Sequence, residues 1–383
     1  MISRKIRVLV VDDSVLFREA IVRGIGADSS IEVVAKAGDP FEARDMILKY
    51  EPDVMTCDVE MPRMNGIEFL ERLLPQYALP VIVVSSVSEA VFDAMDAGAV
   101  DFVAKPLDKT ASNLHAFFQE LIIKIKVAAT SNVAKSQATD SYMTSPYLPK
   151  QYVNTTKNTN PNSNISYTTS VNTTSSVGTN KSKVNSNTGI ENNTINENRI
   201  IAIGASTGGT EAIASVLLQL PALMPGIVIV QHIPPVFSKM FAERLNNQTR
   251  LDVKEAQNGD ILYPGRVLIA PGDQHMRVKK HGNTYRVEVF EGEKVNGHCP
   301  SVDVLFDSVA KEAGSNAIGI ILTGMGYDGA KGLLAMRRKG AHTIGQNEES
   351  CVVYGMPKVA HDIGAVEKQV GLSEVARVLV GMV

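Results

Sequence analysis

The sequence predicts an α/β protein made of two parallel-sheet domains joined by a long disordered segment. Short apolar runs alternate with amphipathic stretches from residue 1 to about 128, and the same alternation resumes at Arg199 and continues to the end. Between them, residues 129 to 198 are dominated by Asn, Ser and Thr. Alternating strands and helices are typical of a parallel sheet with helices on both faces. A segment with few large apolar side chains cannot offset the entropy of ordering, so we expect it to be disordered.

The composition is that of a globular protein without bulk affinity for polyanions. The chain has 383 residues, of which 44% are hydrophobic, and a net charge of −3, which implies no general attraction to nucleic acid or anionic membranes. Its three cysteines, Cys57, Cys299 and Cys351, are far apart, so neither a disulfide framework nor a cysteine zinc site is expected. No apolar run reaches the roughly 18 residues of a spanning helix, and the first run is too short for a secretory signal. We therefore expect a cytoplasmic protein without direct membrane insertion.

Four of the five predicted strands in the first part end in polar residues. The strands are Ile6 to Val11, Val33 to Ala35, Val54 to Cys57, Val81 to Val84 and Phe102 to Ala104, with helices such as Ser14 to Ile25 and Ile67 to Leu74 between them. The residues that follow the four strands are Asp12-Asp13, Asp58, Ser85 and Lys105-Pro106. Because the carboxyl ends of parallel strands meet at one edge, Asp12, Asp13 and Asp58 should converge there.

Three converging carboxylates repel one another unless a cation lies among them. Oxygen ligands at an open edge suit Mg²⁺, which keeps waters and bridges to phosphate. Lys105 adds a fixed positive charge and Ser85 a hydroxyl donor. An aspartate beside Mg²⁺ and lysine can attack a phosphoryl donor and carry an aspartyl phosphate. The alternative, that each acid only caps a turn, does not account for polar residues at four strand ends.

Residues 5 to 126 resemble the response-regulator receiver domain. The resemblance is carried by Asp12-Asp13, Asp58, Met61-Pro62-x-Met64-x-Gly66, Ser85 and Lys105-Pro106. It implies a flavodoxin-like doubly wound parallel sheet in which Asp58 is the phospho-acceptor. It also implies that Asp13 is a direct Mg²⁺ ligand with Asp12 in support, and that Ser85 and Lys105 contact the phosphoryl group.

The predicted linker still allows the two flanking domains to meet. As a coil of roughly 70 residues it would have an r.m.s. span of about 45 Å. Lengthening a linker from about 20 to about 70 residues costs intramolecular docking only about 1 kcal/mol.

In the last part, the segment Ile200 to Gly209 predicts a buried strand, a tight turn and the start of a helix. Ser206 would lie on that turn with an exposed hydroxyl, and Gly204-Ala205-Ser206-Thr207-Gly208 fits the nucleophile-elbow spacing. Taken alone, such a glycine-rich turn more often binds phosphate or simply reverses the chain. A serine nucleophile also needs a base, and the base needs an orienting carboxylate.

His232 is the candidate base because it directly follows the predicted strand Ile227 to Gln231, at the same sheet edge as Ser206. The histidines from His275 to His298 lie in turn-rich, charged stretches and are interpreted as surface residues. A histidine at a strand end is often only a structural hydrogen-bonding group. Its register with Ser206 favours the catalytic interpretation.

Asp328 is the candidate third member. It lies in the glycine-rich loop Thr323 to Ala330, after the predicted strand Ile318 to Leu322, and its alternative role is to cap the following helix. In the catalytic interpretation Asp328 holds His232 in one tautomer, and His232 takes the proton of Ser206. The amides of Thr207 and Met325 could then stabilise the oxyanion.

The order Ser, His, Asp along the chain differs from that of α/β-hydrolases, so that fold is not predicted. Residues 199 to 383 resemble instead the catalytic domain of the chemotaxis protein-glutamate methylesterase family, CheB. The matching motifs are Gly204 to Gly209, Gln231-His232-Ile233-Pro234-Pro235, Ala270-Pro271-Gly272, Pro300-Ser301-Val302-Asp303 and Thr323-Gly324-Met325-Gly326-x-Asp328-Gly329.

The resemblance implies a Rossmann-like α/β esterase domain with a parallel sheet, and Ser206, His232 and Asp328 as its triad. It implies a phosphorylation-activated serine hydrolase that demethylates glutamate methyl esters on chemoreceptors and deamidates selected receptor glutamines. The histidine kinase CheA would be the phosphodonor, and the unphosphorylated receiver would shield the esterase face. Mg²⁺ would serve the receiver, and the ester hydrolysis would need no cofactor. The implied division is a receiver at 1–128, a linker at 129–198 and a catalytic domain at 199–383.

Three other classes of function fit the sequence less well. A signalling adaptor with an inactive second domain does not explain an intact Ser, His and Asp set. A DNA-binding response regulator would need a basic recognition helix, and the C-terminal part offers buried strands without a basic stripe, so nucleic acid is not an expected partner. A nucleotide-binding domain would need the G-x-G-x-x-G spacing, which is absent.

Overall fold

The computed structural model describes residues 4–62, 64–86, 89–106, 108, 110–131 and 199–383. All of these belong to one compact unit, which comprises Met1–Ser141 and Ile195–Val383. The predicted disordered linker lies outside the described residues except for 129–131. In the described ranges no helix combines the length and the apolar character that crossing a membrane requires.

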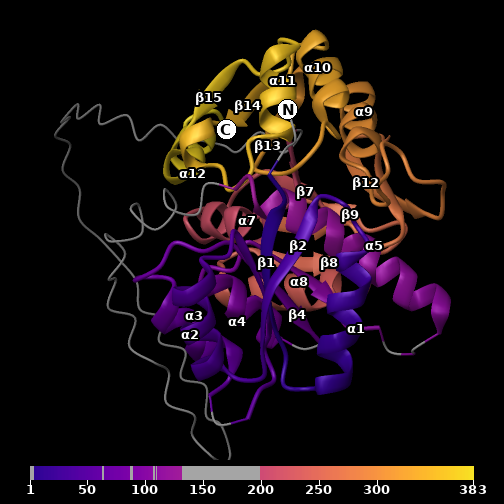
Figure 1. Ribbon diagram of the computed structural model, residues 1–383. Helices are drawn as coiled ribbons and strands as arrows, with labels where there is room; N and C mark the ends of the chain where they lie inside the picture. The colour runs from indigo at the N-terminus through magenta and orange to yellow at the C-terminus, as the bar shows by residue number, and fades with distance from the viewer. Residues whose placement is uncertain (1–3, 63, 87–88, 107, 109, 132–198) are drawn as a thin grey trace, which may run out of the picture. The chain divides into compact units, whose positions relative to one another are not determined.

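The first part folds as a doubly wound parallel sheet, as predicted (Figure 1). Its strands are β1 (Ile6–Val11), β2 (Ile31–Ala37), β3 (Val54–Asp58), β4 (Val81–Ser85) and β5 (Asp101–Ala104), in the order β2-β1-β3-β4-β5. Its helices are α1 (Val15–Gly26), α2 (Pro40–Tyr50), α3 (Gly66–Leu73), α4 (Ala90–Asp96) and α5 (Ala111–Ala128). Successive residues of β1 point to opposite faces. Val8 and Val10 pack with residues of α1 and α5, while Leu9 and Val11 pack with residues of α2, α3 and α4.

The second part contains a seven-stranded parallel sheet, again as predicted. The strands are β6 (Ile200–Ala205), β7 (Gly226–Gln231), β8 (Asp252–Glu255), β10 (Arg266–Ile269), β13 (Ala317–Ile321), β14 (His342–Gln346) and β15 (Lys368–Val370), in the order β15-β14-β13-β6-β7-β10-β8. The helices are α7 (Gly209–Leu218), α8 (Phe237–Gln248), α9 (Val302–Glu312), α10 (Ala330–Arg338), α11 (Met356–Asp362) and α12 (Leu372–Val380), with short 3-10 turns η2 (Gly314–Asn316) and η3 (Glu348–Ser350). Strand β6 lies between β13 and β7 and is buried along its whole length, which explains its unbroken apolar run.

A second, antiparallel sheet in the C-terminal part was not predicted. Strands β11 (His275–His281) and β12 (Thr284–Phe290) form a hairpin, and β9 (Ile261–Leu262) pairs with β12. Met276, Val278 and Val287 bury the inner face of this sheet. The interpretation of His275 as a surface residue was therefore wrong, because its side chain is buried, with 2% of the residue exposed. The alternation of apolar and charged residues in these two strands is the period-two pattern of a half-buried sheet and could have predicted them.

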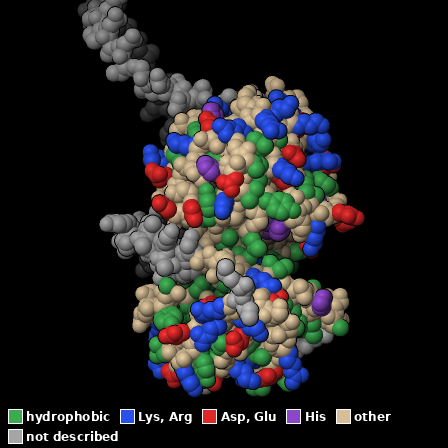
Figure 2. Space-filling model, turned by 45° about the horizontal axis from the view of Figure 1, so that its top comes forward, with side chains coloured by type: hydrophobic (Ala, Val, Ile, Leu, Met, Phe, Trp, Pro, Cys, Tyr) green, Lys and Arg blue, Asp and Glu red, His purple; other side chains and the backbone are tan. Residues whose placement is uncertain are grey.

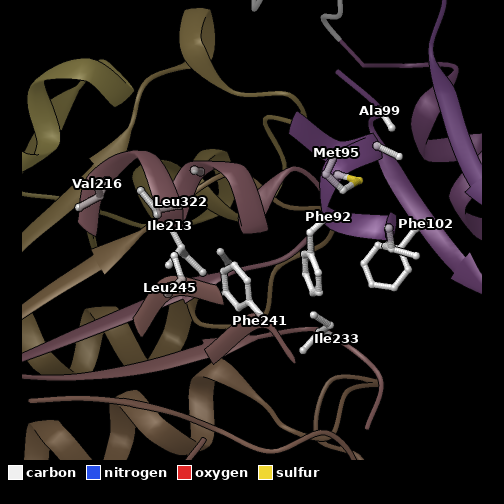
Figure 3. Close-up of a cluster of buried hydrophobic side chains, with 14 of the residues drawn as sticks. Phe92, Met95, Ala99, Phe102, Ile213, Val216, Ile233, Phe241, Leu245 and Leu322 are labelled. Carbon is white, nitrogen blue, oxygen red and sulfur yellow. The ribbon is translucent and has the colours of Figure 1, made fainter. Parts of the chain in front are cut away.

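Within the compact unit, apolar side chains of α4 and β5 pack against those of α7 and α8 (Figure 3). The ring of Phe92 is stacked on that of Phe241 with centroids 5.7 Å apart, and Phe102 lies 4.7 Å from Phe237. At the edge of this cluster Arg244 forms ion pairs with two aspartates of α4. Residues of the two sheet domains thus share one buried cluster.

Val236, the N-cap residue of α8, has a backbone conformation that β-branched residues rarely adopt. Its φ is 74° and its ψ is −48°, while 55% of the residue is exposed. Such strain costs about 1–3 kcal/mol, whereas glycine adds roughly 0.5–1 kcal/mol of unfolded-state entropy. We expect Val236→Gly to stabilise the catalytic domain by about 1 kcal/mol, seen in calorimetry as a rise in unfolding temperature of about 2–4 °C.

The control for this prediction is Glu243→Gly, in the interior of the same helix. Its side chain is 58% exposed, and glycine there should lower stability by about 1 kcal/mol. Equal losses in both variants would show that Val236 is not strained.

Candidate functional site

Ser206 lies on the tight turn between β6 and α7, held from three sides. Its amide donates to the carbonyl of Thr323 at 3.0 Å. Its carbonyl accepts from the amide of Gly209 at 2.7 Å and from Nε2 of Gln231 at 2.8 Å. A Cβ added to Gly324 would lie 2.7 Å from Cβ of Ser206, so only glycine allows this approach. The half-buried Ser206 is thus fixed through its backbone, as a nucleophile requires.

His232 leaves the same edge of the sheet as Ser206. Strands β6 and β7 are paired with Ala205 opposite Gln231. The candidate nucleophile directly follows β6, and the candidate base directly follows β7. Nε2 of His232 lies 2.9 Å from Oδ2 of Asp328. Because a carboxylate only accepts, this contact assigns the ring proton to Nε2. Nδ1 is then the basic nitrogen, and it is buried without a hydrogen-bond partner among the described residues.

Asp328 does not cap the helix that follows it, since Gly329 is the N-cap residue of α10. Its carboxylate lies instead at the N-terminus of α9. It accepts from Oγ of Ser301 at 2.8 Å, from the amide of Val302 at 2.6 Å and from that of Asp303 at 3.3 Å. The Pro300 to Asp303 motif therefore places the first amides of α9 against the Asp328 carboxylate, where they donate to it.

The environment of Asp328 keeps it ionised. Burial alone would raise its pKa, but the hydrogen bonds from His232, from Asn296 and from the amide of Val302 hold the pKa well below its ordinary value. A carboxylate in this state can orient His232 and stabilise the imidazolium that forms when the ring takes a proton.

Two residues of the site escaped the sequence analysis. His298, interpreted as a surface residue, stacks its ring on that of His232 with centroids 3.7 Å apart and an interplanar angle of 7°. Asn296 donates from Nδ2 to Oδ1 of Asp328 at 2.7 Å and to Oδ2 of Asp303 at 2.8 Å. The signal that could have indicated this loop is the dipeptide Asn296-Gly297, which is typical of a tight hairpin turn.

The two amides that were predicted to form an oxyanion hole lie on the loops that flank Ser206. Among the described residues neither the Thr207 nor the Met325 amide donates to a protein acceptor. Thr207 is anchored through its side chain, because Oγ1 donates to Oδ2 of Asp101 at 2.8 Å. Its carbonyl accepts from Oγ1 of Thr323 at 3.0 Å. Both amides are therefore available to an incoming oxygen.

In the receiver, the carboxylates of Asp12, Asp13 and Asp58 converge as predicted. Each offers an oxygen that lies within 4.8 Å of the other two, an arrangement that can hold a cation. Nζ of Lys105 lies 2.5 Å from Oδ2 of Asp58 and 2.9 Å from Oδ2 of Asp12. Burial raises the pKa of Asp12 despite these contacts, while Asp58 and Asp12 outweigh burial and raise the pKa of Lys105. The site therefore has both an acidic cluster and a fixed positive charge.

Two further features of this edge fit an anionic group. The hydroxyl of Ser85 is fully buried and has no hydrogen-bond partner in the described part of the chain. A Cβ added to Gly66 would lie 2.2 Å from the carbonyl oxygen of Asp58, which explains the glycine of the Met61 to Gly66 motif. The orphaned Ser85 hydroxyl and the three carboxylates together fit a metal ion that bridges to phosphate.

Charged side chains of both signs lie on the face of the molecule that Figure 2 shows, where basic and acidic groups are intermingled. The chain as a whole has 38 Lys and Arg residues against 41 Asp and Glu residues. The two signs of charge are thus nearly balanced over the chain.

The lowered pKa of Asp328 leads to a prediction about the stability of the protein. An aspartate whose pKa is lowered on folding contributes stability that is present above pH 4 or so and is lost as the pH falls further. We expect Asp328→Asn to lower the free energy of unfolding by about 3 kcal/mol at pH 7. The variant should also lose less stability than the wild type between pH 5 and pH 3, as measured by urea unfolding at each pH.

Asp362→Asn is the control, because Asp362 is an exposed aspartate at the end of α11 in the same domain. Its effect should stay within about 0.5 kcal/mol. Identical pH dependence in Asp328→Asn and wild type would contradict an ionised Asp328.

Comparisons with known proteins cover both parts of the chain. The family described as CheB methylesterase matches residues 201–379, and the response regulator receiver domain matches residues 8–117. A protein-glutamate methylesterase/protein-glutamine glutaminase 2 of Syntrophomonas wolfei is 52% identical over 376 residues, covering 98% of this chain and 97% of that protein. Proteins named protein-glutamate methylesterase/protein-glutamine glutaminase from Syntrophotalea carbinolica and Sulfurimonas denitrificans are 48% and 45% identical, over 97% and 94% of this chain and 96% and 94% of their own lengths.

Among solved structures, the CheB methylesterase catalytic domain of Thermotoga maritima is 38% identical with a TM-score of 0.47, and the match covers 48% of this chain and 98% of that one. The relatives align along nearly the whole chain, and both family matches coincide with the two sheets described above. The chain therefore belongs to the CheB family of methylesterases that carry a response-regulator receiver domain.

Proposed function

We propose that Ser206, His232 and Asp328 are the catalytic triad of a phosphorylation-activated serine hydrolase, which removes methyl esters from glutamates of chemoreceptors. The enzyme is a protein-glutamate methylesterase and protein-glutamine glutaminase, the activity for which its relatives are named, and it acts in adaptation in bacterial chemotaxis. The observation that carries the triad is the hydrogen bond from Nε2 of His232 to Asp328, which leaves Nδ1 as a buried basic nitrogen without a hydrogen-bond partner among the described residues.

The chemistry follows from this arrangement. Nδ1 of His232 takes the proton of Ser206 as Oγ attacks the ester carbonyl carbon, and Asp328 stabilises the imidazolium. The carbon–oxygen bond to the methoxy group then breaks, and His232 returns the proton to the departing oxygen, releasing methanol. A water molecule, deprotonated by His232, hydrolyses the acyl-enzyme to glutamate and free Ser206. With a glutamine substrate the leaving group is ammonia.

Backbone donors would stabilise the charge on the carbonyl oxygen. The amides of Thr207 and Met325 are the candidates, because they flank Ser206 and have no protein acceptor among the described residues. Removing one oxyanion donor from other hydrolases costs about 3–4 kcal/mol in transition-state stabilisation. The ester hydrolysis needs no cofactor in this scheme.

Regulation is assigned to the receiver. Asp58 would accept a phosphoryl group, with Ser85 and Lys105 contacting its oxygens. Asp12, Asp13 and Asp58 would hold Mg²⁺, which neutralises charge on the transferring group. The donor would be the histidine kinase CheA, in the cytoplasm.

The contacts between the receiver and the catalytic part supply a route for control. Thr207, next to the nucleophile, donates to Asp101 of β5, the strand that ends one residue before Lys105. A shift of β5 on phosphorylation would therefore move Thr207, whose amide is a candidate oxyanion donor. We retain 1–128 as the receiver, 129–198 as the linker and 199–383 as the catalytic domain.

The triad is tested by Ser206→Ala. Methanol release from methylated receptor should fall at least about 10³-fold, because the variant lacks the hydroxyl that is proposed to attack the carbonyl. Phosphorylation of Asp58 by acetyl phosphate should be unchanged. Ser315→Ala, at an exposed position of the same domain, serves as the control. Turnover at the wild-type rate in Ser206→Ala would remove Ser206 from its role.

Receiver control is tested by Asp58→Asn. The variant should keep basal methanol release but lose its stimulation by acetyl phosphate. Its affinity for Mg²⁺, measured by titration calorimetry, should drop because one of three carboxylates is neutralised. Asp45→Asn, at an exposed site on α2, should bind Mg²⁺ and respond like the wild type. Stimulation of Asp58→Asn to the wild-type level would refute control through this residue.

A further inference from the structure

Residues 295–298 form a tight hairpin turn beside the His232–Asp328 pair. Val295 and His298 exchange two backbone hydrogen bonds of 3.0 Å each. Between them Asn296 has a φ of 54° and Gly297 a φ of 86°. Two successive positive φ values are typical of a type I′ turn, for which Asn-Gly is the favoured sequence. The turn therefore has one defined conformation.

The turn delivers two side chains to two different members of the triad. Asn296 donates to the carboxylate of Asp328 at 2.7 Å, on the oxygen that His232 does not use. His298, two residues later, lies face to face on the imidazole of His232. Two residues of one turn thus contact both the proposed base and the carboxylate that orients it.

We propose that the Asn296-Gly297 turn is a positioning device for the catalytic base, in which Asn296 fixes the Asp328 carboxylate and His298 fixes the plane of the His232 ring. The proposal rests on the proposed function, since it assumes that His232 is the base. Neither Asn296 nor His298 is given a chemical step.

Asn296 is suited to this role because its amide is a neutral donor between two acids. Its Nδ2 also donates to Asp303, whose pKa burial raises. An acidic side chain at position 296 would place a third carboxylate against Asp303 and Asp328. It would also remove the donor from Asp328, so the orientation of His232 would be lost through its partner.

His298 is suited to its role because its ring is flat and uncharged. Burial first, and then the neighbouring His232, lower the pKa of His298 to about 4, against the opposing effect of Asp328. A neutral ring offers the face of its π-system to His232, and such a face attracts the cation that His232 becomes during turnover. A ring stacked at 3.7 Å also restricts rotation of the imidazole, which keeps Nε2 on Asp328.

The test compares variants of full-length protein in the methanol-release assay, with kcat and KM determined separately. His298→Leu fills a similar volume without a flat ring, whereas His298→Phe retains the ring. We expect His298→Leu to lower kcat about tenfold with KM changed less than twofold, and His298→Phe to restore kcat to within about threefold of the wild type.

Asn296→Asp separates electrostatics from turn geometry, because Asp-Gly favours the same type of turn. Its kcat at pH 8 should fall more than tenfold, again without a matching change in KM. His281→Ala is the control, since His281 is an exposed histidine at the end of β11 in the same domain. Thermal unfolding of each variant shows whether a loss of kcat accompanies a loss of fold.

Three outcomes would overturn the proposal. One is equal kcat in His298→Leu and His298→Phe, and another is a loss confined to KM. The third is full activity in Ser206→Ala, which would also overturn the proposed function. Wild-type kcat in His298→Leu and Asn296→Asp together with an inactive Ser206→Ala would remove the turn from its role and leave the triad intact.

Discussion

The catalytic domain depends on the placement of one carboxylate, that of Asp328, at the start of helix α9. Five donors converge on it: the Ser301 hydroxyl, the amides of Val302 and Asp303, the Asn296 side chain and the ring of His232. Each removes part of the cost of burying the charge, and together they keep it ionised. The same charge satisfies the free amides of the first turn of α9. Stability of the fold and orientation of the base are therefore joined in one group.

The parallel sheet brings Ser206 and His232 to the same edge as the loop that carries Asp328. Strands β13, β6 and β7 are neighbours in register, and the residues after their carboxyl ends form a single row. Small residues line that row because the loops approach one another closely. Gly208 has a φ of 73°, and a Cβ at Gly324 would press against Ser206. A chain with larger residues at these points could form the sheet but not the site.

Much of this organisation could be predicted from the sequence. Strands with unbroken apolar runs, such as β6 and β13, were placed to within two residues, because burial on both faces leaves a strong signal. Polar residues at strand ends, Asp58 and His232 among them, followed from the rule that parallel strands end at one edge. The hairpin of β11 and β12 was missed because its many charged residues were interpreted as surface, although their alternation with apolar residues is the pattern of a half-buried strand. Asn296 and His298 were missed with it, because a loop gives no periodic pattern that reveals what its side chains contact.

The orientation of the imidazole has a consequence for how such a site can be built. With Nε2 committed to the carboxylate, the nitrogen left for the proposed proton transfer is Nδ1, which is bonded to Cγ and so is the nearer of the two to the main chain. An acceptor so close to its own backbone has a short reach, which in the proposed triad favours an alcohol on the neighbouring strand. Transfer of the proposed site to another scaffold would therefore require the ends of two adjacent strands as one unit. Grafting the three side chains onto separate loops would not reproduce it.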